Sequence, residues 1–337
     1  MAADPASLPG FVSAHSHAFQ RALRGRGAGG DFWAWRDAML AQAERQTPES
    51  VRVEYEQVYR EMRAAGYTAV GEFHYLGLEE AFAALQAARG AGIEIVLLLA
   101  AYERGGLERF RQRSVTAFLG QVEALRATGA RVGVAPHSVR ACSAGWLAEI
   151  GGYADREGLV LHVHADEQPR EVEECLAEHG VRPIELLART GCLTPATTVV
   201  HATHATSDEL DLVADAGSTV CLCPLTEANL GDGFPPLEGL LERQIRLAVG
   251  SDSNVRLDPL EELRELEGTA RRQTLRREVI PVRRLLAIGA ENGAACLGLA
   301  EWPRVELDVT HPSLRGVARE DMLAALVSSC GADVFCT

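Results

Sequence analysis

The chain has 337 residues, of which 47% are hydrophobic and 24% are charged, a composition typical of a globular protein. Its formal net charge of −14 at pH 7 disfavours nucleic acid and anionic membrane surfaces as partners. A small anionic substrate stays compatible with this charge, because arginines close to a binding site can outweigh the net charge of the whole chain.

Location and redox state follow from features that the sequence lacks. No apolar run approaches the ~18 residues that a membrane-spanning helix needs, and the first residues lack the basic and apolar regions of a secretory signal peptide. The eight cysteines are scattered through mostly apolar runs, so reduced thiols are expected. Cys221 and Cys223 are interpreted as a buried pair rather than a zinc clip. A cytoplasmic protein is therefore predicted.

Strand-like and helix-like segments alternate along most of the chain. The first strand ends at His15 and His17, and further strands are expected over residues 68–73, 93–101, 131–136, 159–165, 197–202, 218–224 and 245–250. The expected helices are a long one ending near Gly66 and others over residues 79–89, 114–128, 143–156, 169–179, 207–216, 237–243 and 259–272. Because the strands are almost fully apolar, as a buried parallel sheet requires, the pattern predicts a (β/α)8 TIM-type barrel, with a doubly wound sheet as the alternative.

The domain organisation follows from where this alternation starts and stops. We expect an N-terminal tail over residues 1–10, the barrel over 11–300 and a short C-terminal appendage over 301–337. Edge strands are expected in the appendage over residues 305–309 and 334–336.

Polar residues gather where the expected strands end, and in a barrel these carboxyl ends form the face on which active sites are built. The residues concerned are His15, His17, Glu72, His74, His137, His162, His164, Glu167, His201, His204 and Asp252. Several histidines and a carboxylate converging at a barrel mouth are typical of a mononuclear metal site with one open position.

Some of these residues have a plainer interpretation. His162 is interpreted as a core histidine, and His204 as a loop residue or a partner of a ligand. Either Glu72 or His74 could face the barrel mouth. Asp252 could cap the next turn, but its position after the eighth strand favours a functional role.

Longer motifs resemble the formimidoylglutamate deiminases, a family in the deaminase branch of the amidohydrolase superfamily. The resemblance covers residues 9–300, and its motifs are HSHAFQR (15–21), GYTAVGEFHY (66–75), HADE (164–167), VHATH (200–204), CPLTEANLGDG (223–233) and GSDS (250–253). The family carries a small β-sandwich built from both chain ends, which is expected to be reduced or missing here. Asn254 stands where the family commonly has histidine.

The resemblance implies a metal-dependent, hydrolytic activity. It implies that one Zn2+, or Fe2+ or Mn2+ in its place, is held by His15, His17, His164 and Asp252. It further assigns catalytic roles to Glu167, His201 and Asp252.

The resemblance also implies the substrate and its contacts. The substrate would be N-formimidoyl-L-glutamate, a small anionic amidine from histidine degradation, and the products N-formyl-L-glutamate and ammonia. Residues implied in substrate binding are Gln20, Arg36, Tyr75, His137 and Arg140. Two alternatives stay open: a related deaminase for a nucleobase or guanidino compound, and a truncated homologue without catalytic activity. A homodimer is compatible with the sequence.

Overall fold

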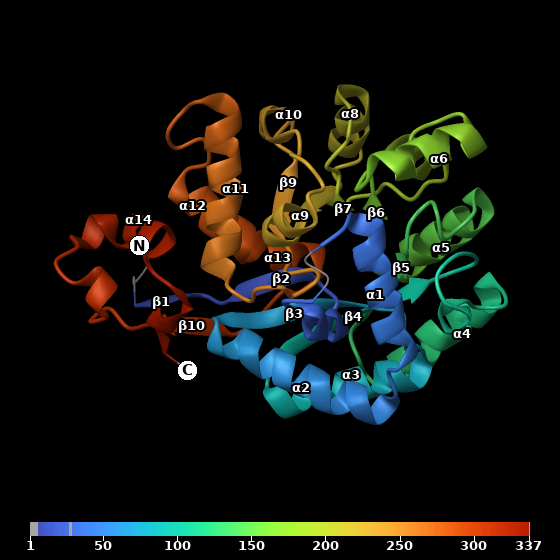
Figure 1. Cartoon of the computed structure of the whole chain (residues 1–337), viewed down its shortest axis with the longest axis horizontal. Coiled ribbons are helices and arrows are strands. Elements are labelled where there is room, and N and C mark those ends of the chain that lie inside the picture. Colours follow the sequence, from blue (N-terminus) through green and yellow to red (C-terminus); the bar gives the residue numbers. More distant parts are fainter. Residues whose placement is uncertain (1–5, 27–28, 337) are drawn as a thin grey trace.

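An eight-stranded parallel sheet forms the centre of the molecule in the computed structural model, which describes residues 6–26 and 29–336 (Figure 1). The strands follow one another in chain order: β2 (Phe11–Ser16), β3 (Tyr67–His74), β4 (Glu94–Ala101), β5 (Val132–Pro136), β6 (Leu161–Ala165), β7 (Thr197–His201), β8 (Thr219–Leu222) and β9 (Arg246–Val249). The predicted (β/α)8 barrel is thereby confirmed, and the doubly wound sheet, which needs a reversal in strand order, is wrong.

The barrel is closed by hydrogen bonds between the end of β2 and the segment that follows β9. The Asp252 amide donates to the His15 carbonyl at 3.0 Å, and the His17 amide donates to the Asp252 carbonyl at 2.8 Å. The Ser13 hydroxyl accepts from the Ser251 amide at 3.0 Å, so a side chain joins the same seam. These bonds connect the segment after β9 to β2.

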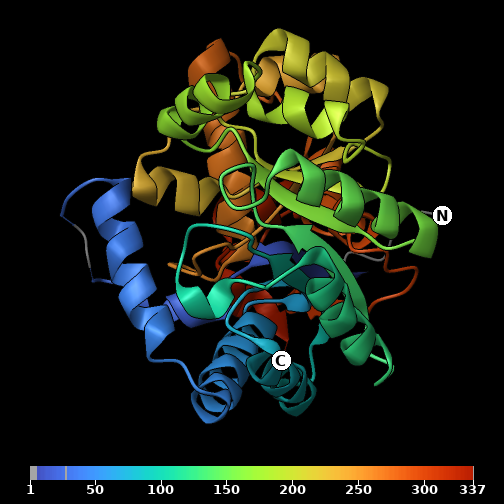
Figure 2. The same ribbon diagram turned by 90° about the vertical axis from the view of Figure 1, so that its right-hand side faces the viewer.

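Helices surround the strands as an outer ring (Figure 2). In chain order they are α1 (Phe32–Glu44), α2 (Pro48–Ala64), α3 (Leu78–Ala91), α4 (Val115–Arg126), α5 (Ala144–Glu157), α6 (Pro169–His179), α7 (Pro183–Arg189), α8 (Ser207–Asp215), α9 (Pro224–Leu230), α10 (Leu237–Glu242), α11 (Pro259–Thr274), α12 (Val282–Gly289), α13 (Glu291–Cys296) and α14 (Met322–Ser329). Those predicted between residues 79 and 272 are present, with ends within about two residues of the expected ones.

The helix that ends near Gly66 is preceded by a separate helix, α1. The break lies at Thr47 and Pro48: Thr47 caps α2 by accepting from the Ser50 amide, and Pro48 occupies the first turn of α2. Proline is favoured in a first helical turn because its missing amide proton is not needed there. As a result α1 is a separate helix at one edge of the molecule, visible in blue in Figure 2.

A second, three-stranded antiparallel sheet joins the two ends of the described chain. It contains β1 (Ser7–Pro9), β10 (Arg304–Leu307) and β11 (Phe335–Cys336), and β1 and β10 lie side by side in Figure 1. The predicted edge strands of the appendage are therefore present, and within the described residues they form this small sheet together with β1. Phe335 packs its ring 5.5 Å from that of Phe11, so the small sheet supports the start of β2.

The membrane and cysteine predictions concern the whole chain. Among the described residues, no helix is both long and apolar enough to cross a membrane. The eight cysteines are free thiols, and Cys221 and Cys223 are both buried, as expected of a buried pair.

Close packing between β2 and β3 leaves no room for a side chain at Gly71. A Cβ there would lie 2.5 Å from the Ala14 carbonyl oxygen, a backbone atom beside His15, and 2.5 Å from Leu297 Cδ2. We expect Gly71→Ala to lower the free energy of unfolding by about 1–3 kcal/mol, as overpacked cores do. Urea unfolding followed by circular dichroism measures this change.

Gly120, on an exposed part of α4, is the matched control, because a Cβ there meets no atom within 4 Å. Gly120→Ala should leave the stability unchanged or raise it by up to about 1 kcal/mol. Equal stabilities of the two variants would contradict the packing argument at Gly71.

Candidate active site

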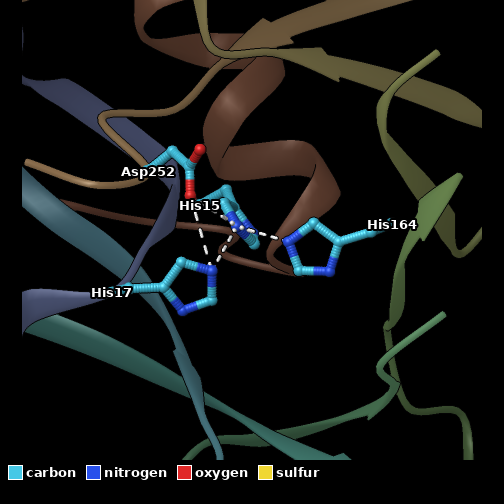
Figure 3. A group of neighbouring side chains, drawn as sticks. All are labelled: His15, His17, His164 and Asp252. Atoms are coloured by element: carbon cyan, nitrogen blue, oxygen red, sulfur yellow. Dashed lines mark hydrogen bonds and ion pairs between the residues drawn. The ribbon is translucent and has the colours of Figure 1, made fainter. Parts of the chain in front are cut away.

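Three imidazoles and one carboxylate converge at the carboxyl end of the barrel (Figure 3). His15 lies in β2, His17 directly follows it, His164 lies in β6, and Asp252 follows β9. The Nε2 atom of His15 is 3.1 Å from that of His17 and 3.1 Å from that of His164. Asp252 Oδ1 is 3.4 Å from the Nε2 atoms of both His15 and His17. The structure thus brings together the four predicted ligands.

The tautomers of two of these histidines are set by backbone carbonyls. His17 Nδ1 lies 2.9 Å from the Phe73 carbonyl oxygen, and His164 Nδ1 lies 3.0 Å from that of His137. A carbonyl only accepts, so each Nδ1 carries the proton and each Nε2 directs a lone pair into the cluster.

The donor set fits a metal ion. Atoms bound at 2.0–2.2 Å around a tetrahedral Zn2+ lie about 3.3–3.5 Å apart, which is close to the spacing of these atoms. Burial lowers the pKa of His15 to about 3, so its imidazole is neutral at pH 7. Burial alone would raise the pKa of Asp252, but its hydrogen bond with His15 and the neighbouring imidazoles hold it at about 2. Neutral imidazoles and an ionised carboxylate are the forms that bind metals.

Glu167 and His201 lie beside this cluster. His201 Nε2 is 3.8 Å from Glu167 Oε1 and 3.9 Å from Asp252 Oδ2. Burial raises the pKa of Glu167, although His201 and Arg140 oppose the shift. Burial alone would lower the pKa of His201, but the charge of Glu167 and the hydrogen bond to Glu227 raise it well above its usual value. Both side chains are therefore able to hold a proton next to the ligand cluster.

Glu227 orients His201 and was not assigned a role from the sequence. Its Oε1 accepts from the Cys223 amide at 2.8 Å and lies 3.1 Å from His201 Nδ1. The carboxylate therefore fixes the ring so that Nε2 faces Glu167 and Asp252. His201, Cys223 and Glu227 could geometrically hold an ion, but these hydrogen bonds already account for the position of Glu227.

The backbone at these positions is strained. His201 and Asp252 have φ angles of 75° and 42°, in the left-handed region that residues other than glycine seldom adopt. Such strain occurs at functional sites, where the surrounding structure holds it in place.

A pocket opens onto the cluster. Its lining includes all five residues predicted to bind substrate, together with His17, His164, Glu167, His201 and Asp252. His15 is completely buried beneath these residues. The pocket is also lined by side chains that were not predicted: Phe32, Trp35, Met39, Leu40, Tyr102, Arg104 and Ser138.

Of the pocket residues that were not predicted, Tyr102 could have been found from the sequence. It directly follows the apolar strand predicted over 93–101, the same position relative to a strand that drew attention to the histidines. Arg104 donates to the carbonyls of Arg140 and Val139 and pairs with Glu178, so it supports the loop that carries Arg140.

The remaining polar residues at the strand ends lie outside the pocket lining. His162 is buried in the core with Nε2 3.1 Å from the Cys296 carbonyl oxygen, and His204 Nε2 lies 2.9 Å from that of Asp232. Neither Glu72 nor His74 lines the pocket. Glu72 instead accepts from the Ala18 amide at 2.8 Å and holds the turn after His17. Asn254 donates to the Ser16 hydroxyl and accepts from that of Ser251, so it links the end of β2, next to His15 and His17, to the segment that carries Asp252.

Comparison with known proteins agrees with this arrangement. A family model described as "Amidohydrolase family" matches residues 7–301. The chain belongs to the amidohydrolase family. It is therefore a hydrolase of a metal-dependent family, and the four residues of the cluster could hold a metal ion.

Relatives within the family differ in substrate. The chain is 37% identical to formimidoylglutamate deiminase from Pseudomonas aeruginosa over 329 residues, covering 87% of this chain and 72% of the relative. It is 29% identical to 5-methylthioadenosine/S-adenosylhomocysteine deaminase from Halobacterium salinarum, covering 86% and 68%.

Solved structures resemble the whole described fold. An amidohydrolase from Brucella melitensis superimposes with a TM-score of 0.88 and 30% identity over 98% of this chain and 84% of that one. An adenosine deaminase from Xanthomonas campestris with bound zinc has a TM-score of 0.89 and 22% identity, covering 98% and 77%, and shares the fold.

Loss of one ligand should remove the metal. We expect His17→Ala, purified without added metal, to contain less than about a tenth of the metal of the wild type and to have a lower Tm, since a bound ion stabilises the folded state. Elemental analysis by mass spectrometry and a thermal melt measure both quantities.

His179→Ala is the control, because His179 ends α6 and is not part of the cluster. It should keep the metal content of the wild type. Full metal content in His17→Ala would show that these four residues are not the binding site.

Proposed function

We propose that this protein hydrolyses N-formimidoyl-L-glutamate to N-formyl-L-glutamate and ammonia. The observation that carries the proposal is a pair of arginines, Arg36 and Arg140, in the pocket that opens onto the ligand cluster. A substrate with two carboxylates next to a reactive amidine needs cationic groups of this kind, and guanidinium pairs with carboxylate in a bidentate way. The 37% identical relative, named as formimidoylglutamate deiminase, supports the same substrate.

The two guanidinium groups are available to a ligand to different degrees. Arg140 Nη2 donates to Glu167 Oε2 at 3.4 Å, and its Nε lies 3.5 Å from Glu171 Oε1. Among the described residues, no carboxylate forms an ion pair with Arg36. Burial lowers the pKa of His137 most, and the positive charges of Arg140 and Arg36 lower it further. The imidazole of His137 is therefore neutral at pH 7.

The proposed metal is Zn2+, with Fe2+ or Mn2+ as the alternatives that elemental analysis would distinguish. Held by His15, His17, His164 and Asp252, the ion would lower the pKa of a water molecule to about 7 and polarise the amidine. The reaction adds the water oxygen to the formimidoyl carbon and breaks the bond from that carbon to its imino nitrogen, which leaves as ammonia.

The residues of the chain move the protons in this proposal. Asp252 accepts a proton from the water, and His201, oriented by Glu227, stabilises the attacking oxygen by hydrogen bonding. Glu167 donates to the imino nitrogen and then to the leaving group, because an amide anion is far too basic to leave unprotonated. Glu167 suits this role because it is buried beside His201 and its pKa is raised.

Gln20 and Tyr75 complete the proposed substrate contacts. Gln20 Nε2 donates to the Tyr75 hydroxyl at 3.0 Å, and the ring of Tyr75 lies 5.2 Å from that of His17. The pair therefore forms a wall of the pocket beside the ligand cluster.

A second candidate is deamination of a purine nucleoside. Phe32, Trp35, Tyr75 and Tyr102 give the pocket aromatic surfaces on which a nucleobase could stack, and a relative is named for such a substrate. Ammonia release from N-formimidoyl-L-glutamate, 5-methylthioadenosine and a guanidino acid, each at equal concentration, separates the candidates. Release from the nucleoside alone would reject the proposed function.

Glu167→Gln tests the proton donor. The amide keeps the size and hydrogen bonding of the carboxyl but cannot exchange a proton, so we expect kcat to fall about 100- to 10,000-fold with the metal content unchanged. A coupled ammonia assay measures kcat.

Glu174→Gln is the matched control, because Glu174 lies on the exposed side of α6, where it pairs with Arg170. Its kcat should equal that of the wild type. If Glu167→Gln also kept full turnover, Glu167 would not be the proton donor.

Arg36→Met tests whether this arginine of the pocket binds the substrate. Because no ion pair to Arg36 is lost in the free protein, the effect should fall on substrate binding, with KM raised at least about tenfold and the Tm unchanged. Steady-state kinetics with N-formimidoyl-L-glutamate measure KM, and the surface variant Arg60→Met should leave it unaltered. An unchanged KM in Arg36→Met would remove Arg36 from the substrate site.

A further inference from the structure

Tyr102 presents a polar group to the pocket that no part of the proposed mechanism uses. It follows the last residue of β4, Ala101, and its ring is packed against those of His137, Phe110 and Tyr75 at centroid distances of 4.5, 5.4 and 5.8 Å. Its backbone amide donates to Gln112 at 2.9 Å. The ring is thus clamped on several sides, and the direction of its hydroxyl is set before any ligand binds.

The hydroxyl of Tyr102 has no hydrogen-bond partner among the described residues, although the side chain lines the pocket. The other tyrosine of the pocket differs, because the Tyr75 hydroxyl accepts from Gln20 and contacts Met39. A rigid, unpaired phenol in a binding pocket is a hydrogen-bond donor held ready for a ligand.

The ligand group that suits this donor is an anion. Burial raises the pKa of Tyr102, and the charges of Arg140 and then Arg36 are the strongest influences in the opposite direction. Arg36 and Arg140 line the same pocket as Tyr102, whose hydroxyl stays protonated. A neutral donor next to two cations matches a carboxylate, which accepts several hydrogen bonds at once.

Distance from the metal ligands indicates which carboxylate this is. The ring of His137 lies 4.7 Å from that of His164, and Tyr102 lies beyond His137. Among the described residues, Tyr102 makes no ring contact with a ligand histidine. In N-formimidoyl-L-glutamate the formimidoyl carbon is three bonds from the α-carboxylate and five from the side-chain carboxylate, about 4 Å and about 6 Å when extended. The position of Tyr102, one ring further from the ligands than His137, fits the more distant group.

We propose that the Tyr102 hydroxyl determines specificity by donating a hydrogen bond to the side-chain carboxylate of the substrate, alongside Arg36 and Arg140. This inference rests on the proposed function. It makes Tyr102 part of the preference for a dicarboxylate over a shorter acid or a nucleoside.

Three substrates and one substitution test the inference. N-formimidoyl-4-aminobutyrate keeps the distal carboxylate and lacks the α-carboxylate, and N-formimidoyl-L-2-aminobutyrate has the opposite pattern. We expect Tyr102→Phe to raise KM about tenfold for N-formimidoyl-L-glutamate and for the first analogue, with kcat within about twofold. KM for the second analogue should not change. If Tyr102 had only a structural role, Tyr102→Phe would change KM for all three substrates by the same factor.

Tyr153→Phe is the matched control, because Tyr153 lies on α5 and bonds to Glu123, outside the pocket lining. It should leave all three KM values unchanged, and Tyr102→Phe should keep the metal content and Tm of the wild type. Equal increases for all substrates, or no increase for N-formimidoyl-L-glutamate, would overturn the inference.

Failure of the proposed function has a different signature. If the wild type released no ammonia from N-formimidoyl-L-glutamate, that function would be rejected, and calorimetric binding of glutarate would test Tyr102 directly. Weaker glutarate binding by Tyr102→Phe than by the wild type would support carboxylate recognition at this position. Equal binding, or no binding to the wild type, would reject it.

Discussion

The backbone hydrogen bonds that join the end of β9 to β2 are the constraint on which the site depends. They pair Asp252 with His15 and His17, so the residues that close the barrel also supply most of the ligand cluster. His164 then arrives from β6, across the barrel. Because each ligand lies in a strand or within three residues of a strand end, its position is determined largely by strand register. A rigid scaffold of this kind is what a preorganised metal site needs.

Electrostatics at the site differ from those of the whole chain. The protein carries a net charge of −14, yet its pocket presents Arg36 and Arg140 to a ligand. Burial strengthens such local interactions because little water is present to screen them. The two carboxyl groups at the site, Asp252 in the ligand cluster and Glu167 beside it, differ in pKa. Burial raises the pKa of Glu167, whereas the hydrogen bond with His15 and the neighbouring imidazoles hold that of Asp252 low. Two carboxyl groups with separated pKa values suit a reaction that must both accept and donate protons.

The small sheet at the chain ends also contributes to the site, through packing. Phe335 of β11 contacts Phe11 at the start of β2, and the Trp302 indole donates to the Gly10 carbonyl at 2.9 Å. The strand that carries His15 is therefore covered at its amino end, and its carboxyl end is joined to the segment after β9. Even as three short strands, the sheet built from both ends protects the beginning of the barrel.

Local pattern in the sequence determined the order and type of the barrel elements, because fully buried strands must be apolar and helices need caps and periodic faces. It also placed the ligand histidines, since parallel strands in one barrel all end at the same face. The split between α1 and α2 at Pro48 was marked by local residues but not predicted. His162 was interpreted as a core histidine from the sequence, and its burial agrees, but only the tertiary structure shows that its partner is the Cys296 carbonyl of α13. The same holds for Glu227, which orients His201 from α9, and for Tyr102, whose unpaired hydroxyl is defined by residues from distant segments. Such contacts depend on how the strands and loops pack in three dimensions, so they cannot be predicted from a local sequence pattern.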